Sequence, residues 1–312
     1  MTSVLVTGGA GFIGSNIVET LLQKGYSVRV LDNITTGRKE NLSGLLGKAD
    51  FINGDIRDLE TVKESIKGVD YVIHQAALPS VTRSVENPIE TSECNTKGTL
   101  NILEAARKAD VKRIVYASSS SVYGDTEELP KKETMRLKPL SPYAVTKITM
   151  EYYFDVFSKV YGIKSVGLRY FNVYGPRQDP SSDYAAVIPK FINSALNEKS
   201  PTIYGDGEQT RDFTFVRDVV HANIISMDAK GISHDVFNIA RGEFISINNL
   251  FKKITSILGK DIKPVYTEPR QGDILHSLAD ITKAREKLGY NPEYTMEDGL
   301  NRTIKWFRDN HV

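Results

Sequence analysis

Short apolar runs rich in β-branched residues alternate with longer segments of helical periodicity through the first half of this 312-residue chain. The runs are Val4–Val6, Val28–Leu31, Tyr71–Ile73, Arg113–Tyr116 and Ser165–Leu168. Continuous apolar runs are typical of parallel strands that helices cover on both faces. The pattern therefore predicts an α/β fold built on a doubly wound parallel sheet.

The alternation weakens beyond about residue 172, where glycine and proline punctuate the chain more often. Asn172–Pro176 and Tyr204–Gly207 are two such stretches. We therefore expect residues 1–172 to form a cofactor-binding domain, completed by part of 212–240. Residues 173–312 are expected to form mainly a smaller C-terminal α/β domain that binds the substrate. A chain of this length can bury the core that two lobes require.

A glycine-rich loop follows the first predicted strand and opens a predicted helix. It consists of Gly8, Gly11, Phe12, Ile13 and Gly14 with two intervening residues. Backbone N–H groups at such a helix start can approach a pyrophosphate, because no Cβ atom obstructs them. Asp32 ends the next strand 18 positions after Gly14 (32 − 14), where a carboxylate accepts from ribose hydroxyls and repels a 2′-phosphate. The loop and Asp32 predict a Rossmann-type domain that binds NAD, although Arg38 could recruit the phosphate of NADP.

Tyr143 and Lys147 lie four positions apart on a predicted helix, so they share one face. Ser118–Ser121 follow the 113–117 strand, at the carboxyl edge where open α/β sheets place their ligands. Bringing a phenol from its ordinary pKa to neutrality requires roughly 4 kcal/mol. One ammonium about 4 Å away contributes that much only at a protein-like dielectric constant of about 20. The pair therefore predicts a catalytic phenol in a partly buried cleft.

Composition excludes several classes of function. Lys and Arg number 40 against 39 Asp and Glu, so the chain has no bulk positive field to hold a nucleic acid. Cys94 is the single cysteine, and the five histidines show no metal-ligand spacing. No apolar run approaches the roughly 20 residues that span a bilayer. Met1 leads into a strand without a signal peptide, which favours the cytoplasm.

The motifs resemble those of the extended short-chain dehydrogenase/reductase family, and within it the UDP-hexose 4-epimerases. They are most like the epimerases that act on UDP-N-acetylglucosamine. The resemblance covers nearly the whole chain and is carried by residues 7–14, 32–33, 54–58, 74–77, 119–124, 143–147, 169–172, 211–218 and 270–273. It implies NAD as a tightly held cofactor and a UDP-sugar as substrate.

The resemblance also implies roles for individual residues. The catalytic set is Ser119, Tyr143 and Lys147. The cofactor set is Gly8, Gly11, Phe12, Ile13, Gly14, Asp32, Asn33, Asp55, Ile56, Ala76, Ala77, Asn95, Tyr143, Lys147 and Tyr170. The substrate set is Ser80, Ser119, Ser120, Tyr143, Asn172, Thr202, Tyr204, Arg211, Arg270, Asp273 and Ser277.

In the implied arrangement Asn172, Arg211 and Arg270 hold the diphosphate, and the 202–204 strand flanks the uracil. Ser277 falls where epimerases restricted to non-acetylated sugars resemble one another in having a bulky tyrosine. A serine there leaves room for a 2-acetamido group. The family further implies a homodimer, formed through the helix of Tyr143 and the helix near 100–106.

Other functions compete with simple inversion. Nucleotide-sugar 4,6-dehydratases of the same family carry an acidic pair where this chain has Ser120 and Ser121. UDP-glucuronate epimerisation or decarboxylation is a further alternative within the family. A non-catalytic NAD-binding sensor is the alternative of another class, and it predicts a broken catalytic set. Ser119, Tyr143 and Lys147 are all present, so epimerisation is the preferred interpretation.

Overall fold

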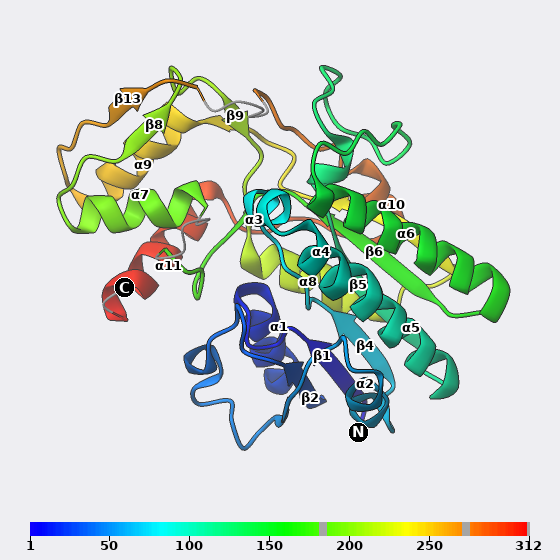
Figure 1. Cartoon of the computed structure of the whole chain (residues 1–312). Helices are drawn as coiled ribbons and strands as arrows, with labels where there is room; N and C mark the ends of the chain where they lie inside the picture. The colour runs from blue at the N-terminus through cyan, green and yellow to red at the C-terminus, as the bar shows by residue number, and fades with distance from the viewer. Residues whose placement is uncertain (181–185, 270–274, 311–312) are drawn as a thin grey trace.

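The computed structural model describes residues 1–180, 186–269 and 275–310. A parallel sheet runs through its centre, in the order β11-β6-β5-β4-β1-β2-β3 (Figure 1). Its strands are β1 (Ser3–Thr7), β2 (Ser27–Asp32), β3 (Asp50–Asn53), β4 (Tyr71–His74), β5 (Arg113–Ser119), β6 (Ser165–Tyr170) and β11 (His234–Ile239). The order reverses between β1 and β4, which confirms the predicted doubly wound sheet.

Helices cover both faces of the sheet. The first face carries α1 (Phe12–Gln23) and α8 (Val216–Met227), and the second carries α2 (Leu59–Ile66), α5 (Gly98–Lys108) and α6 (Pro142–Tyr161). Alternate residues of one strand serve different cores, because successive side chains point to opposite faces. Val4 and Val6 join the first core, and Leu5 joins the second. Because both faces are buried, the strands are continuous apolar runs in the sequence.

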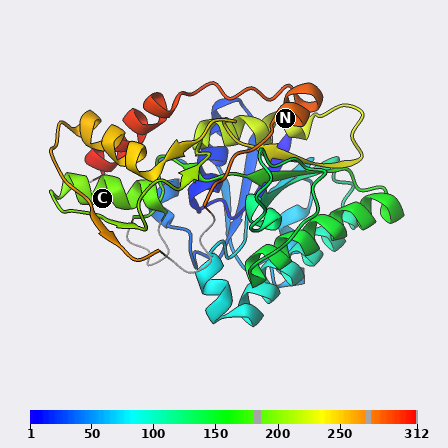
Figure 2. The ribbon, with the colours of Figure 1, turned by 90° about the horizontal axis from the view of Figure 1, so that it is seen from above.

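A second lobe packs beside the sheet. Its helices α7, α9 and α11 contact one another and lie together at one end of the molecule, while α6 lies at the other (Figure 2). The lobe and its connections contain α7 (Val187–Leu196), β8 (Thr202–Tyr204), β9 (Thr210–Arg211), β12 (Ile245–Ser246), α9 (Ile247–Leu258), β13 (Val265–Thr267), α10 (Thr282–Leu288) and α11 (Met296–Asp309). Strand β8 pairs with β13, and β9 pairs with β12.

Short elements complete the chain. They are η1 (Lys39–Leu42), α3 (Val81–Glu86), α4 (Pro88–Ser92), the π-helical η2 (Glu93–Lys97), η3 (Ser120–Tyr123), β7 (Val173–Tyr174) and β10 (Thr214–Phe215). None of the described helices has the length and apolar character that crossing a membrane requires.

The chain returns to the sheet late. After the 173–211 stretch, α8 packs against α1, and β11 then pairs with β6 along its whole length. Residues 216–239 thus lie against elements from the first 172 residues. The domain boundary at 172/173 remains a prediction.

Candidate functional site

A cavity of about 490 Å³ opens at the carboxyl ends of the sheet strands. Many of the residues predicted from the sequence line it. They are Gly8, Gly11, Phe12, Ile13, Gly14, Asp32, Asn33, Asp55, Ile56, Ala76, Ala77, Ser119, Tyr143, Lys147, Tyr170 and Asn172. The cavity therefore joins the glycine loop to the proposed catalytic residues, and we refer to it as the cofactor cavity.

The glycine loop is too tight for side chains. Gly8 has φ +69°, and a Cβ on it would lie 2.7 Å from the backbone nitrogen of Ala76. A Cβ on Gly14 would lie 2.1 Å from the Gly8 carbonyl oxygen. Helix α1 then begins without a side-chain cap at Gly11, so its first N–H groups are available to an anion. The loop thus fits the pyrophosphate of a dinucleotide.

Asp32 is placed to recognise a ribose. Its carboxylate is buried at the end of β2, and it accepts hydrogen bonds from the backbone N–H groups of Ala10 at 2.9 Å and Ile34 at 2.8 Å. Burial raises the pKa of Asp32, and the two N–H donors oppose that effect. Each oxygen keeps a further lone pair for a ribose hydroxyl. Arg38, the competing signal for NADP, pairs with Asp179, so the cavity fits NAD.

Helix α6 carries Tyr143 and Lys147, two of the three proposed catalytic side chains. It begins at Pro142, with the hydroxyl of Ser141 accepting from the N–H of Ala144, and it ends at Gly162 in the left-handed conformation. Tyr143 and Lys147 are both buried on the face turned toward β5.

Tyr143 and Lys147 have different hydrogen-bond partners. The side chain of Tyr143 is hydrogen-bonded to Ser119, whereas Lys147 Nζ donates to the carbonyl of Ala117 at 2.8 Å. Lys147 Nζ lies 5.7 Å from the centre of the Tyr143 ring. The lysine therefore acts on the phenol through its field rather than through a direct bond.

Burial makes deprotonation of Tyr143 harder than the sequence suggested. Loss of water raises the pKa of Tyr143 to about 12, although the hydrogen bond with Ser119 opposes the rise. Burial also lowers the pKa of Lys147 to about 8. The expectation of roughly 4 kcal/mol started from a phenol with an ordinary pKa and did not include this burial.

A second cavity of about 550 Å³ adjoins the first. It is lined by Thr202 and Tyr204 of β8 and by Arg211 of β9, and it shares Asn172 with the cofactor cavity. Arg211 Nη1 donates to the Leu275 carbonyl at 3.2 Å. The structure therefore brings four of the predicted substrate residues together beside the catalytic set, in what we call the nucleotide cavity.

Four described residues of the predicted site lie off the two cavities, and Asn95, Ser80 and Ser120 are three of them. Asn95 is fully buried, and its amide bonds to the backbone of Leu78 and to Thr146 at 3.0 Å. Ser80 caps α3 by accepting from the N–H of Arg83 at 3.0 Å. Ser120 starts the 3₁₀ turn η3. Asn95 and Ser80 support segments near the cavities, and direct roles for all three in binding remain predictions.

The remaining predicted substrate residues belong to 270–280. Arg270 and Asp273 lie outside the described residues. Ser277 is half-buried, and its N–H donates to the Thr210 carbonyl at 3.1 Å. This bond holds Ser277 beside Arg211, although it is not among the described residues that line either cavity.

Sequence reasoning missed several residues that line the cofactor cavity, among them Gln75 and Cys94. Gln75 lines it and donates to the hydroxyl of Tyr170 at 3.1 Å. Cys94 also lines it, and burial raises the pKa of this thiol to about 11, so it stays protonated. The position of Gln75 directly after β4 was a usable signal, whereas Cys94 carried none.

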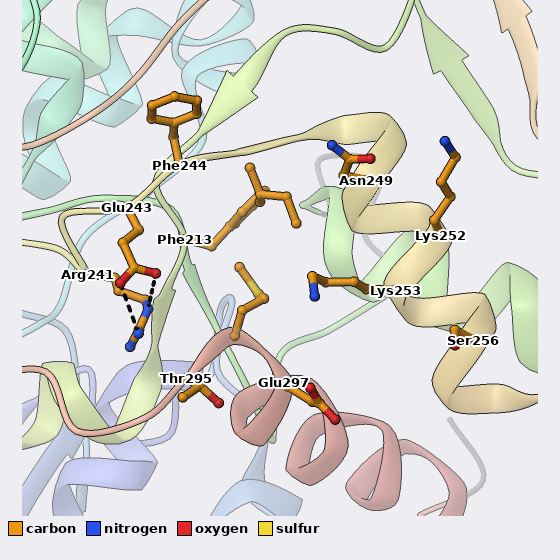
Figure 3. Close-up of a pocket in the computed structure, with 12 residues that line it drawn as sticks. Phe213, Arg241, Glu243, Phe244, Asn249, Lys252, Lys253, Ser256, Thr295 and Glu297 are labelled. Carbon is orange, nitrogen blue, oxygen red and sulfur yellow. Dashed lines mark hydrogen bonds and ion pairs between the residues drawn. The ribbon is translucent and has the colours of Figure 1, made fainter.

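A third cavity, of about 720 Å³, lies away from the catalytic residues (Figure 3). The 241–245 segment, α9 and the start of α11 enclose it, and Phe213 separates it from the nucleotide cavity. Arg241 and Glu243 pair on one side, while Lys252 and Lys253 project from α9 in different directions. No cluster of side chains suited to a metal ion occurs in the described part of the chain.

Comparisons with known proteins agree with this geometry. The family model described as NAD dependent epimerase/dehydratase matches residues 4–240. A UDP-glucose 4-epimerase from Mycolicibacterium smegmatis is 38% identical over 310 residues, covering 98% of each chain.

Two solved structures are similar over almost the whole chain. One is a UDP-N-acetylglucosamine 4-epimerase from Methanobrevibacter ruminantium M1 in complex with UDP-N-acetylmuramic acid, with a TM-score of 0.95, 42% identity and 99% coverage of both chains. The other is a UDP-glucose 4-epimerase from Thermotoga maritima with UDP-glucose, with a TM-score of 0.95, 41% identity and complete coverage of both. The chain therefore belongs to the NAD dependent epimerase/dehydratase family of extended short-chain dehydrogenases/reductases, and its cofactor is NAD.

Proposed function

We propose that this protein is a UDP-sugar 4-epimerase whose preferred substrates are UDP-N-acetylglucosamine and UDP-N-acetylgalactosamine. One observation carries the proposal: the hydrogen-bonded pair Tyr143–Ser119 lies in the cofactor cavity, which meets the nucleotide cavity at Asn172. A sugar whose nucleotide occupies the second cavity therefore reaches the phenol and the nicotinamide end of the first. The similar solved epimerases support the same reaction.

The residues suit a reversible oxidation at C4. Bound NAD supplies a nicotinamide that takes the C4 hydride and returns it. Tyr143, as the phenolate, removes the O4 proton while the C4–H bond breaks, which leaves a 4-ketose. Ser119 holds O4, and Arg211 with Asn172 retains the diphosphate while the sugar turns over. Tyr143 then gives the proton back on the other face, so the alcohol is inverted and no external reductant is consumed.

The turn after β5 does not carry the acidic pair that dehydration requires. Elimination of water needs a carboxylic acid and a base near C5 and C6 of the sugar. Ser120 and Ser121 occupy the corresponding turn η3 after β5, and a hydroxyl cannot replace a carboxylic acid at neutral pH. A non-catalytic NAD sensor is disfavoured because Tyr143 and Lys147 retain buried, convergent positions.

A panel of substrates tests the function. Purified protein is incubated without added reductant with UDP-glucose, UDP-galactose, both N-acetylated sugars and UDP-glucuronate, and the products are identified by NMR. We expect C4 epimers of the acetylated pair as the main products. A 6-deoxy-4-keto sugar would show dehydration, and a pentose would show decarboxylation. No product from any substrate would favour the sensor.

Substrate preference is proposed to depend on Ser277. Its backbone bond to Thr210 holds it next to the strand of Arg211, and the neighbouring His276 ring bonds to the Thr210 hydroxyl at 3.0 Å. A small side chain at this point leaves space beside the turning sugar for a 2-acetamido group.

Ser277→Tyr is expected to reduce kcat/KM for the acetylated pair by at least about tenfold, because a misfit in a sugar pocket costs about 1–3 kcal/mol. Activity on UDP-glucose and UDP-galactose should change by less than about twofold. Steady-state assays on both pairs measure the difference, with Ser277→Ala as a control that removes only the hydroxyl. Equal losses for both pairs would remove Ser277 from the specificity argument.

A homodimer is proposed through an apolar surface on α3, α4 and α6. Val85, Ile89, Tyr152 and Val156 are 63%, 75%, 64% and 49% exposed, and these helices contact one another. Large apolar side chains exposed on neighbouring helices are a common mark of a protein–protein interface. The helix near 100–106, also expected from the sequence to take part, buries Ile102 on one face against the core. Its part in the dimer remains a prediction.

Val156→Glu combined with Ile89→Glu is expected to convert the dimer to a monomer, because each change would bury a carboxylate in the interface. Light scattering after gel filtration measures the mass. Phe244→Glu, at an aromatic side chain 60% exposed elsewhere on the molecule, is the control and should leave the mass unchanged. A double variant that keeps the wild-type mass would rule out this surface.

A further inference from the structure

Three consecutive residues at the end of β5 each form a hydrogen bond with a different side chain of α6. These side chains occur every fourth residue of the helix, so they line one face. The bonds are Lys147 Nζ to the Ala117 carbonyl at 2.8 Å, Ser118 Oγ to Glu151 Oε1 at 2.6 Å, and the side-chain hydrogen bond between Ser119 and Tyr143. Two of the bonds belong to the proposed catalytic set. The middle one, between Ser118 and Glu151, has no role in the chemistry described above.

Glu151 is itself held from the other side. Arg169 Nε and Nη2 donate to its two oxygens at 2.9 and 2.7 Å, and the side chains of Arg169 and Glu151 are only 3% and 7% exposed. Arg169 lies opposite Ser118 in the β5–β6 register. Its Nη1 donates to the hydroxyl of Tyr123 at 2.9 Å, and that hydroxyl donates to Asn238 Oδ1 at 2.6 Å. The network leaves the carboxylate a single position.

Ser118 lines the cofactor cavity, whereas neither Glu151 nor Arg169 lines any of the three cavities within the described chain. Burying both charges costs free energy, and an apolar pair of similar volume could pack the same space at less cost. Stability alone therefore does not explain why this pair is buried. Its position between the hydrogen bonds that Lys147 and Tyr143 form with β5 suggests a role in holding the site.

We propose that Glu151, fixed by Arg169 and bonded to Ser118, is a positioning residue that sets α6 on the end of β5 and so fixes the Tyr143–Ser119 geometry. The proposal rests on the proposed epimerase function. A helix anchored only by its own catalytic groups would shift whenever those groups exchange a proton. The hydrogen bond between Ser118 and Glu151 takes no part in the proton transfer, so it holds the helix in place throughout the reaction. Misplacement of a reacting group by about 1 Å can cost about a hundredfold in rate.

Ser118→Ala tests this directly, because it removes the tie to β5 and leaves the Glu151–Arg169 pair intact. We expect kcat to fall by about tenfold or more, with KM for the UDP-sugar within about twofold and NAD content unchanged. Ser165→Ala is the matched control: Ser165 is a buried serine of the adjacent strand, bonded to the His234 ring at 2.8 Å at the opposite end of the sheet. It should leave kcat within about twofold.

Tyrosinate absorbance gives a second readout that does not depend on turnover. The ionisation of Tyr143 in NAD-loaded protein is obtained by subtracting the titration of the same variant carrying Tyr143→Phe. Ser118→Ala is expected to move this ionisation to higher pH, since it loosens the bond to Ser119. The titratable groups that face Lys147 are His74 of β4, Cys94 of η2 and Glu151 of α6 itself. The substitution leaves His74 and Cys94 unchanged and removes one hydrogen bond from Glu151.

The outcomes separate the two proposals. Unchanged kcat and unchanged Tyr143 ionisation in Ser118→Ala would overturn the positioning role. Equal losses of kcat in Ser118→Ala and Ser165→Ala, with equal falls in melting temperature, would also overturn it by showing a merely structural effect. A wild-type protein that turns over no UDP-sugar would refute the proposed function alone, because the titration still tests the positioning of Tyr143.

Discussion

Tyr143→Phe is expected to lower kcat by about 10²–10⁴-fold, the usual contribution of a positioned acid–base group. The ring remains to fill its place beside β5, so the fold and the cofactor cavity should persist. The affinity for UDP should stay within about twofold, because the nucleotide cavity is lined by β8 and β9 rather than by α6. Steady-state kinetics and calorimetric titration with UDP measure the two quantities.

Tyr116→Phe is the control for this prediction. Tyr116 lies on β5, is fully buried, and has a hydroxyl without a hydrogen-bond partner among the described residues. Removing that hydroxyl should leave kcat unchanged. If Tyr143→Phe kept most of its rate, another group would be the base, and Ser119 would be the first candidate.

Glu151→Leu is expected to lower the free energy of unfolding by about 3–5 kcal/mol, because it leaves the buried charge of Arg169 without a partner. Combining it with Arg169→Met should cost less than the sum of the two single changes, since the double variant leaves no unpaired charge. Urea denaturation at one protein concentration and neutral pH measures all three variants.

The contrast on the same helix is the exposed pair of Lys159 and Asp155, whose side chains are 71% and 35% exposed. Asp155→Ala should cost no more than about 0.5 kcal/mol, as for other surface pairs four residues apart. If Glu151→Leu lowered the free energy of unfolding as little as Asp155→Ala does, water would reach the Arg169 guanidinium and the pair would not be effectively buried.

The sheet could be predicted because its evidence is local. Each parallel strand is covered on both faces, so Val4, Leu5 and Val6 are all apolar although they serve two cores. The short strands of the second lobe, such as β9 with two residues, have no such signal. Their pairing depends on partners far along the chain, as between Arg211 and Ile245, which periodicity cannot identify.

The site was predicted best where the residue type alone restricts the chemistry. Gly14 and Asp32 are placed as expected, because a crowded loop needs glycine and a ribose needs an acceptor. The Glu151–Arg169 network was missed, since a single charged residue in a helix or strand looks like a solvent-facing position. One signal was available: Arg169 is a charged residue in a strand made mostly of apolar residues, and a charge buried on a sheet must find a partner.

The late return of β11 to the sheet limits how far the protein can fold while it is being synthesised. Strand β6 is complete at Tyr170, yet its outer neighbour is made only from residues 234–239. Until then the row of N–H and C=O groups on β6 forms an open edge, to which another unfinished chain could add a strand. The cofactor lobe therefore cannot close its sheet as an independent N-terminal unit during synthesis. The nascent chain must carry the whole 173–211 stretch, with its share of the nucleotide cavity, before the strand that seals the first lobe becomes available.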